Sequence, residues 1–309
     1  MFYAALPVRV ARSIRSFRPE IVIVQGAQDT ALALLARRLA RFDVPIVFDV
    51  HGDWRNDTRV YGSRFRRVVS PVTDRLAGVA VRRADGVRTV SEFTSSLVRE
   101  QGVEPTATFP AYMDLDPFLA SLPASFRTPP TALFVGVLER YKAIDVLARS
   151  WPLVAARVPE AQLRIVGRGS MQAVVDGLVA AGDHRVSWEP ELPTEGVVDA
   201  LDRATLLVLP SRREGMGRVV VEAFCRGRAV VGTASGGIPD LVVDDVNGLL
   251  VPVEDAGLLA AALTRVLSDP PTAARLGDGA RVSSARWAAT PEEFAARMRG
   301  LIDAVLREG

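Results

Sequence analysis

The chain has 309 residues, 49% apolar and 24% charged, a composition typical of a folded protein large enough for two domains and not of a disordered chain. A net charge of only +2, without clusters of basic and aromatic residues, argues against a nucleic-acid-binding protein. Cys225 is the single cysteine, which excludes an internal disulfide and a cysteine-rich zinc site. The chain opens on a helical pattern, and short β-branched segments then alternate with longer helical ones.

The β-branched segments are predicted to be strands of two parallel sheets. Continuous apolar strands are typical of sheets that helices cover on both faces. The segments lie at residues 21–24, 46–50 and 87–90 in the N-terminal half, and at 133–135, 163–166, 206–209 and 229–232 in the C-terminal half. This alternation predicts an α/β protein of two Rossmann-like domains, whose ligands bind at the carboxyl ends of the strands.

A segment rich in proline and serine, residues 116–130, is predicted to link the domains. The predicted boundaries are 1–126 for the N-terminal domain, 127–288 for the C-terminal domain and 289–309 for a last helix. That helix begins at a capping box, Thr290 to Glu293, with Pro291 at its first position. Its apolar stripe consists of Phe294, Met298, Leu301, Ile302 and Val305. We therefore expect the helix to dock on another part of the chain.

The loop at residues 211–217 is the main candidate site. It follows the strand at 206–209 and precedes a helix at 219–226, and its glycines allow close approach to backbone N–H groups at the positive end of that helix. A diphosphate would fit there, and Glu214 and Glu222 could bind the hydroxyl groups of a sugar and a ribose. The alternative is that Glu222 belongs to a solvated ion-pair stripe with Arg218 and Arg226.

Lys142 is a second candidate, because it is the only lysine among 38 basic residues. A chain this rich in arginine keeps a lysine where a compact ammonium group is required. The alternative is a surface lysine without a role.

Several segments together resemble the retaining glycosyltransferases of family four. The main one is PSRREGMGRVVVEAFCRGRAVVGTASGGIPDLVVDDVNGLLVP, whose Glu-x7-Glu motif consists of Glu214 and Glu222. Further matches are LFVGVLERYKAIDVL, LRIVGRGSM, PIVFDVHGDW, VRTVSEFTSSL and FPAYMDLDPF. Because these matches are ordered, correctly spaced and spread over the chain, the resemblance is more specific than a lone glycine motif.

The resemblance implies a GT-B fold of two Rossmann-like domains facing a cleft, with the acceptor on the N-terminal domain and the last helix crossing back to it. The expected reaction moves a hexosyl group from a nucleotide-diphosphate sugar to a sugar, lipid or small-molecule hydroxyl, with retention, in carbohydrate biosynthesis. Neither a metal nor a further cofactor is expected. The predicted donor-binding residues are Arg140, Lys142, Gly167, Gly215, Met216, Gly217 and Glu222, and the predicted catalytic ones are His51 and Glu214. Glu222 would hold the ribose, Glu214 and the 215–217 backbone the transferred sugar, and Lys142 the diphosphate.

His51 follows the strand at 46–50, and in similar enzymes this histidine faces the donor sugar. The alternative is a loop histidine without a role, as we expect for His184. Asp49, Asp53 and Asp57 surround His51, but their irregular spacing without a second ligand cluster argues against a metal site.

The sequence departs from the family in two places. Val137 stands where relatives carry an arginine, and we expect Arg140 to replace that phosphate contact. The chain also opens directly on a helix, where relatives have a strand, a glycine-rich loop and further units. We therefore expect an incomplete first sheet with an exposed apolar edge. This departure leaves open a catalytically silent nucleotide-sugar-binding or interaction module. A sugar-nucleotide epimerase of the same architecture would not predict the Glu-x7-Glu motif.

The location predicted from the sequence is cytoplasmic. Apolar runs fall short of the roughly 20 residues that cross a bilayer, and no signal-peptide pattern is present. Four arginines recur every three residues on the opening helix, namely Arg9, Arg12, Arg15 and Arg18. Such a stripe is solvated, or it contacts an anionic membrane if the acceptor is a lipid headgroup.

Overall fold

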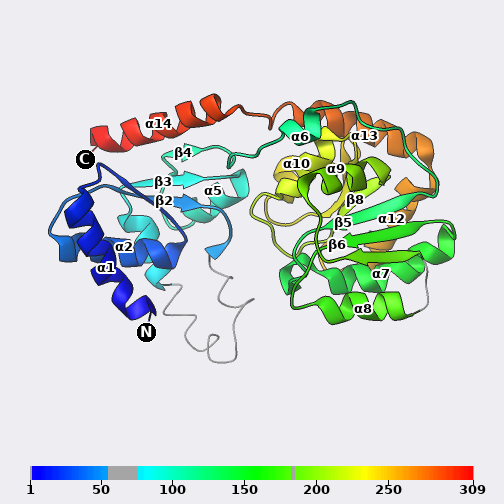
Figure 1. The fold of residues 1–309 in the computed structure, drawn as a ribbon, viewed down its shortest axis with the longest axis horizontal. Helices are drawn as coiled ribbons and strands as arrows, with labels where there is room; N and C mark the ends of the chain where they lie inside the picture. The colour runs from blue at the N-terminus through cyan, green and yellow to red at the C-terminus, as the bar shows by residue number, and fades with distance from the viewer. Residues whose placement is uncertain (1, 55–74, 182–184, 309) are drawn as a thin grey trace. The chain divides into compact units, whose positions relative to one another are not determined.

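The computed structural model describes residues 2–54, 75–181 and 185–308, so Asp57 and His184 lie outside the described residues. The chain divides into two compact units, each described here by itself. The first unit consists of Met1–Tyr112 and Ala289–Gly309, and the second of Met113–Ala288. Each contains a parallel sheet with helices packed against it (Figure 1), which confirms the predicted α/β fold of Rossmann-like domains.

The first unit has a sheet of order β1-β2-β3-β4. Its elements are α1 (Phe2–Phe17), β1 (Val22–Gln25), α2 (Ala27–Ala40), β2 (Ile46–Val50), β3 (Gly86–Thr89), α5 (Glu92–Arg99), β4 (Ala107–Thr108) and α14 (Pro291–Glu308). All of β2 and β3 is buried, as their apolar sequences predict. By contrast, β1 is an edge strand of the described sheet and Ile23 is 39% exposed, as we expected for an apolar edge.

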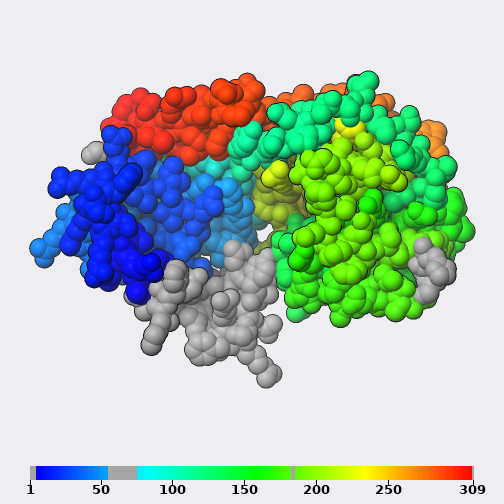
Figure 2. All heavy atoms as spheres, viewed as in Figure 1, coloured from blue at the N-terminus to red at the C-terminus, as the bar shows by residue number. Residues whose placement is uncertain are grey.

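Helix α14 packs on the first unit through the predicted apolar stripe. Leu301 and Val305 are buried against Val47 of β2. The capping box is also present, since Thr290 N–H donates to Glu293 at 3.1 Å and Glu293 N–H donates to the Thr290 hydroxyl at 3.2 Å. Figure 2 shows α14 in red. The predicted last helix and its start are therefore confirmed.

The opening helix α1 packs on α2 through Ala11 and Ile14. Arg15 is exposed as well, but its guanidinium also donates to the carbonyls of Leu39 at 2.6 Å and Ala40 at 2.9 Å, at the end of α2. The other three arginines of the stripe are exposed, and their contact with anionic lipid stays a prediction. Within the described residues, none of the helices has both the length and the apolar character needed to span a bilayer.

The second unit has a sheet of order β10-β9-β8-β5-β6-β7. Its elements are α6 (Asp116–Leu119), β5 (Thr131–Val135), the 3₁₀ turn η1 (Arg140–Lys142), α7 (Ile144–Arg157), β6 (Gln162–Val166), α8 (Gln172–Ala180), β7 (Val186–Glu189), α9 (Thr194–Arg203), β8 (Leu206–Leu209), α10 (Arg218–Cys225), β9 (Ala229–Thr233), α11 (Ile238–Leu241), β10 (Gly248–Val251), α12 (Ala256–Ser268) and α13 (Pro270–Ser284). The chain builds outward from β5 in one direction and then from β8 in the other, so the switch of strand order lies between β5 and β8. Ligands of open parallel sheets bind at this switch.

The predicted boundary near Arg127 differs from the observed one, which falls after Tyr112. The segment that follows packs on the second unit, because the buried Arg226 guanidinium donates to the carbonyls of Phe118, Ser121 and Leu122 at 2.8–3.1 Å. Arg226 also forms a bidentate pair with Asp202 at 2.9 and 2.8 Å. The proline- and serine-rich composition indicated a loop correctly, but gave no sign of these buried contacts.

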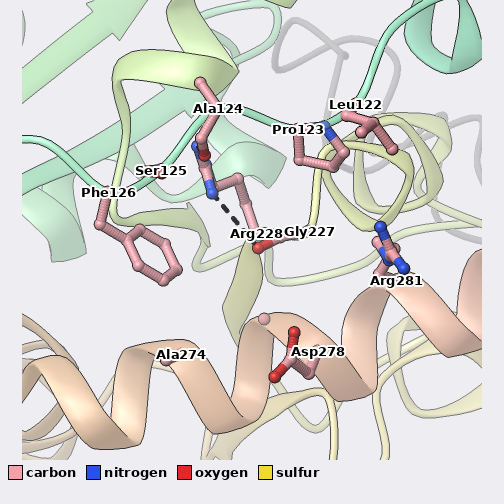
Figure 3. A pocket seen from close by; sticks show the side chains of 11 residues that line it. Leu122, Pro123, Ala124, Ser125, Phe126, Gly227, Arg228, Ala274, Asp278 and Arg281 are labelled. Carbon is pink, nitrogen blue, oxygen red and sulfur yellow. Dashed lines mark hydrogen bonds between the residues drawn. The ribbon is translucent and has the colours of Figure 1, made fainter.

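Arg228 holds the next part of the same segment. Its guanidinium donates to the carbonyl of Ala124 at 2.6 Å and lies 4.7 Å from the centre of the Phe126 ring. Figure 3 shows these residues beside a cavity of about 270 Å³ that Asp278 and Arg281 of α13 also line. Burial lowers the pKa of Arg228 to about 10.

Candidate functional site

The loop between β8 and α10 occupies the predicted place at the carboxyl edge of the second sheet. Gly217 precedes α10 with φ +83°, a left-handed conformation that favours glycine. As a glycine, Gly217 gives this end of the helix no side-chain cap. Val220 N–H donates to the Gly217 carbonyl at 2.9 Å, while the N–H groups of Arg218 and Val219 have no hydrogen-bond partner among the described residues. These two groups are therefore the ones available to an anion.

A second loop, residues 233–237 after β9, fixes the backbone of the first. Thr233 Oγ1 donates to the Ser211 carbonyl at 2.5 Å, and Gly237 N–H donates to the Glu214 carbonyl at 2.8 Å. Gly236 has φ +61°, and a Cβ atom there would lie 2.2 Å from the Glu214 carbonyl oxygen. Residues 233–237, the TASGG part of the segment that resembles the family, thus support the backbone of the candidate site. The sequence alone did not reveal this role.

Lys142 and Glu214 meet at the strand-order switch. They are 72 residues apart in sequence, yet Lys142 Nζ lies 2.5 Å from Glu214 Oε2. Their side chains are only 10% and 14% exposed. The two residues that the sequence singled out separately therefore form one buried ion pair.

Glu222 lies on α10 and is largely buried, with a side chain 12% exposed. Burial raises its pKa, and the Arg218 guanidinium, 2.8 Å away, only partly offsets this effect. The alternative of a solvated stripe holds only for the Arg218–Glu222 pair, because Glu222 itself is buried and Arg226 pairs with Asp202 instead. A buried carboxylate is suited to accept hydrogen bonds from ligand hydroxyl groups.

The structure places the other predicted donor residues around the same edge of the sheet. Met216 is buried in the loop, and Arg140 is exposed on η1, where its guanidinium has no hydrogen-bond or ion-pair partner among the described residues. Val137, after β5, is also exposed. Gly167 directly follows β6 beside Gly136, and a Cβ atom at Gly167 would lie 1.9 Å from the Gly136 carbonyl oxygen. Close backbone packing therefore already requires a glycine at 167.

Sequence reasoning missed the charged cluster around Arg212. Its guanidinium donates to both carboxylate oxygens of Asp145, at 2.9 and 2.7 Å, and also binds Glu254 and the Arg140 carbonyl. These bonds, led by the one to Asp145, raise the pKa of Arg212. Burial acts to raise the pKa of Asp145, but the Arg212 guanidinium lowers it below its ordinary value. Because the partners lie 67 and 42 residues from Arg212, no local pattern could have predicted the cluster.

In the first unit, His51 belongs to a hydrogen-bonded network at the carboxyl ends of the strands. His51 Nε2 lies 2.9 Å from Asp49 Oδ2 and 3.3 Å from Gln25 Nε2. Arg88, buried on β3, donates to both oxygens of Asp49 at 2.8 and 3.0 Å, and to the carbonyls of Phe109 and Pro110. Burial acts to raise the pKa of Asp49, but His51 and Arg88 together lower it.

The network gives Asp49 a function other than metal binding, since its carboxylate is already shared between Arg88 and His51. Across the described residues, groups of three or more metal-ligating side chains are absent. The predicted catalytic histidine is thus oriented by a carboxylate, which the sequence did not predict, although Asp49 and His51 share the matched segment PIVFDVHGDW.

Each unit has a parallel α/β sheet, and the second has a glycine loop and a lysine–glutamate pair at its strand-order switch, an arrangement that fits the GT-B class of glycosyltransferases. Family models agree in both units: "Glycosyl transferases group 1" matches residues 129–269, and "Glycosyl transferase 4-like domain" matches residues 2–110. The chain belongs to the group 1 glycosyltransferases. These matches do not support the epimerase alternative or the silent-module alternative.

Similar proteins extend the match over nearly the whole chain. A glycogen synthase of Mycobacterium tuberculosis is 30% identical over 321 residues, covering 97% of this chain and 74% of that protein. A D-inositol 3-phosphate glycosyltransferase of Corynebacterium diphtheriae is 32% identical over 171 residues, covering 52% of this chain and 40% of that protein.

Solved structures share the fold. The sucrose-phosphate synthase of Thermosynechococcus elongatus has a TM-score of 0.82 at 23% identity, covering 99% of this chain and 79% of that chain. The HepE protein of Anabaena, in complex with UDP-glucose, has a TM-score of 0.74 at 18% identity, covering 97% of this chain and 81% of that chain.

Proposed function

We propose that the protein transfers a hexosyl group from a nucleoside-diphosphate sugar to an acceptor hydroxyl, with retention at the anomeric carbon and without a metal. The observation that carries the proposal is the convergence of Lys142, Glu214 and the uncapped start of α10 at one strand-order switch. A hexose donor is supported by the relatives, because the Anabaena protein of the same fold binds UDP-glucose.

In the proposed reaction, the bond between the anomeric carbon and the diphosphate oxygen breaks. The acceptor oxygen bonds to the same carbon, and its proton passes to the departing diphosphate. Negative charge develops on the leaving group, and we assign its stabilisation to the Lys142 ammonium and the N–H groups that begin α10. These fixed positive groups supply the charge that a magnesium ion supplies elsewhere.

The remaining predicted residues bind the donor in this proposal. Glu222 accepts hydrogen bonds from the ribose, and Glu214 with the 215–217 backbone binds the transferred sugar. Arg140, whose guanidinium is exposed and unpaired among the described residues, adds a phosphate contact. His51, oriented by Asp49, binds a sugar hydroxyl.

A thermal-shift screen tests the donor assignment. UDP-, ADP- and GDP-glucose are added to the wild-type chain and to Glu222→Ala, with EDTA present throughout. A donor that binds the folded state raises the melting temperature of the wild type, and the shift shrinks in the variant. Equal shifts in both proteins would refute the role of Glu222. With an acceptor present, NMR of the product gives the anomeric configuration, and inversion would refute the retaining assignment.

A further inference from the structure

Two hydrogen bonds from Arg212 hold the turn that carries Lys142. The Arg212 guanidinium donates to the carbonyl of Arg140, and its backbone N–H donates to the carbonyl of Tyr141 at 2.7 Å. These are the two carbonyls that precede Lys142 in η1. Arg212 lies two residues before Glu214, so one residue connects the lysine turn to the loop of the glutamate.

The same guanidinium connects the lysine turn to α7. Asp145 lies in the first turn of α7, three residues after Lys142, and both of its oxygens accept from Arg212. Between them Ala143 has φ +53°, a conformation that costs energy for a residue with a Cβ atom. The bonds to Arg212 on both sides of Ala143 oppose relaxation of this backbone.

An arginine is required for this set of contacts. Its planar fork reaches a backbone carbonyl and two separate carboxylates, those of Asp145 and Glu254, from three different nitrogen atoms. A lysine ammonium donates from a single atom and cannot span all three acceptors.

We propose that Arg212 is a positioning residue that holds the Lys142 ammonium in the place where it binds the donor diphosphate. This inference rests on the proposed function. Arg212 acts through the turn 140–142, so its effect on ligand binding depends on the presence of Lys142.

Arg149 offers a matched control. Its guanidinium approaches the same two carboxylates, Asp145 at 3.4 Å and Glu254 at 3.6 Å. Within the described part of the chain it makes no hydrogen bond to the carbonyls of Arg140 or Tyr141. Loss of Arg149 therefore disturbs the carboxylates while leaving the turn attached to Arg212.

The experiment is a double-mutant cycle read by titration calorimetry with UDP, ADP, GDP and inorganic pyrophosphate. The variants are Arg212→Met, Lys142→Met, the double variant, Arg149→Met and Arg212→Lys, and circular dichroism verifies that each is folded at the titration temperature. We expect Arg212→Met to weaken diphosphate binding by about tenfold, or about 1.4 kcal/mol, in the wild-type background. In the Lys142→Met background the same change should have less than about a twofold effect. Arg149→Met should bind as the wild type, and Arg212→Lys should not restore binding.

The outcomes separate the two proposals. If Lys142→Met weakens binding but Arg212→Met does not, or if Arg212→Met weakens binding equally in both backgrounds, the positioning role of Arg212 is wrong and the donor site stands. If none of the four ligands binds the wild type, or Lys142→Met binds them unchanged, the donor assignment itself fails and the inference fails with it.

Discussion

Replacing Arg226 with methionine should strongly destabilise the second unit, because methionine keeps much of the side-chain volume and removes every donor. Arg226 is fully buried, and its loss leaves Asp202 and the carbonyls of Phe118, Ser121 and Leu122 without their donor. Breaking a buried ion pair by removing one partner costs about 3–5 kcal/mol. Since the Asp202 side chain is 19% exposed, water can partly solvate it, and we take the lower end, about 3 kcal/mol.

The single cysteine makes the assay specific to this unit. Cys225 is buried next to Arg226, and burial raises its pKa to about 11, so its thiol is protected until the second unit unfolds. Pulsed thiol labelling across a urea gradient then gives the free energy of unfolding for the wild type and the variant. At about 2–4 °C per kcal/mol for a unit of this size, the melting temperature should also fall by about 6–12 °C.

Arg203→Met is the control for this prediction. Arg203 pairs with Asp199 at 2.8 Å on the surface of α9, and loss of such a pair costs less than about 1 kcal/mol. A loss below about 1 kcal/mol for Arg226→Met, equal to that of the control, would refute the account in which Arg226 holds residues 118–122 on the second unit.

Three further predictions follow from individual contacts. Gly236→Ala should weaken UDP or ADP binding and lower the melting temperature, because Gly236 has φ +61° and the new Cβ atom would lie 2.2 Å from the Glu214 carbonyl oxygen. The control Gly257→Ala, whose Cβ atom would meet only Asp255 at 3.4 Å, should change neither quantity. Equal effects of the two substitutions would contradict the role of residues 233–237. Burial raises the pKa of Glu222 above its unfolded value of about 4.3. Between these two pKa values the folded state binds more protons than the unfolded state, so the free energy of unfolding falls as the pH rises through this window. Urea unfolding should therefore show Glu222→Gln gaining stability relative to the wild type between pH 4 and pH 8 while losing donor binding; a constant difference across this range would contradict the burial effect. Native Cys225 should not react with a disulfide reagent at pH 8 and should react fully in urea, and rapid native labelling would show that its site opens freely.

The placement of the candidate donor-site elements was largely predictable from the sequence because their signals are local. The strand at 206–209, the glycine loop and α10 follow one another, and the rarity of lysine drew attention to Lys142. The capping box at Thr290 is local as well, and the structure confirms it.

The arginines that fix the architecture could not be predicted in this way. In a chain with so many arginines, Arg88, Arg212 and Arg226 look like surface residues, yet Arg88 and Arg226 are fully buried. Their partners are backbone carbonyls and carboxylates tens of residues away, and only the strand order brings them together. The boundary near Arg127 was misplaced for the same reason.

The most direct test of the proposed function is release of nucleoside diphosphate from a nucleotide sugar. Purified wild type, Lys142→Met, Glu222→Ala and the control Arg149→Met are incubated with UDP-, ADP- and GDP-glucose in EDTA, with and without simple sugar acceptors, and the released diphosphate is measured. The proposed function predicts release from at least one donor by the wild type and the control, and a loss of at least about tenfold, or about 1.4 kcal/mol in transition-state stabilisation, in the other two variants. Release that requires an added divalent metal would contradict the metal-independent mechanism, and equal release by all four proteins would contradict the assignment of the site.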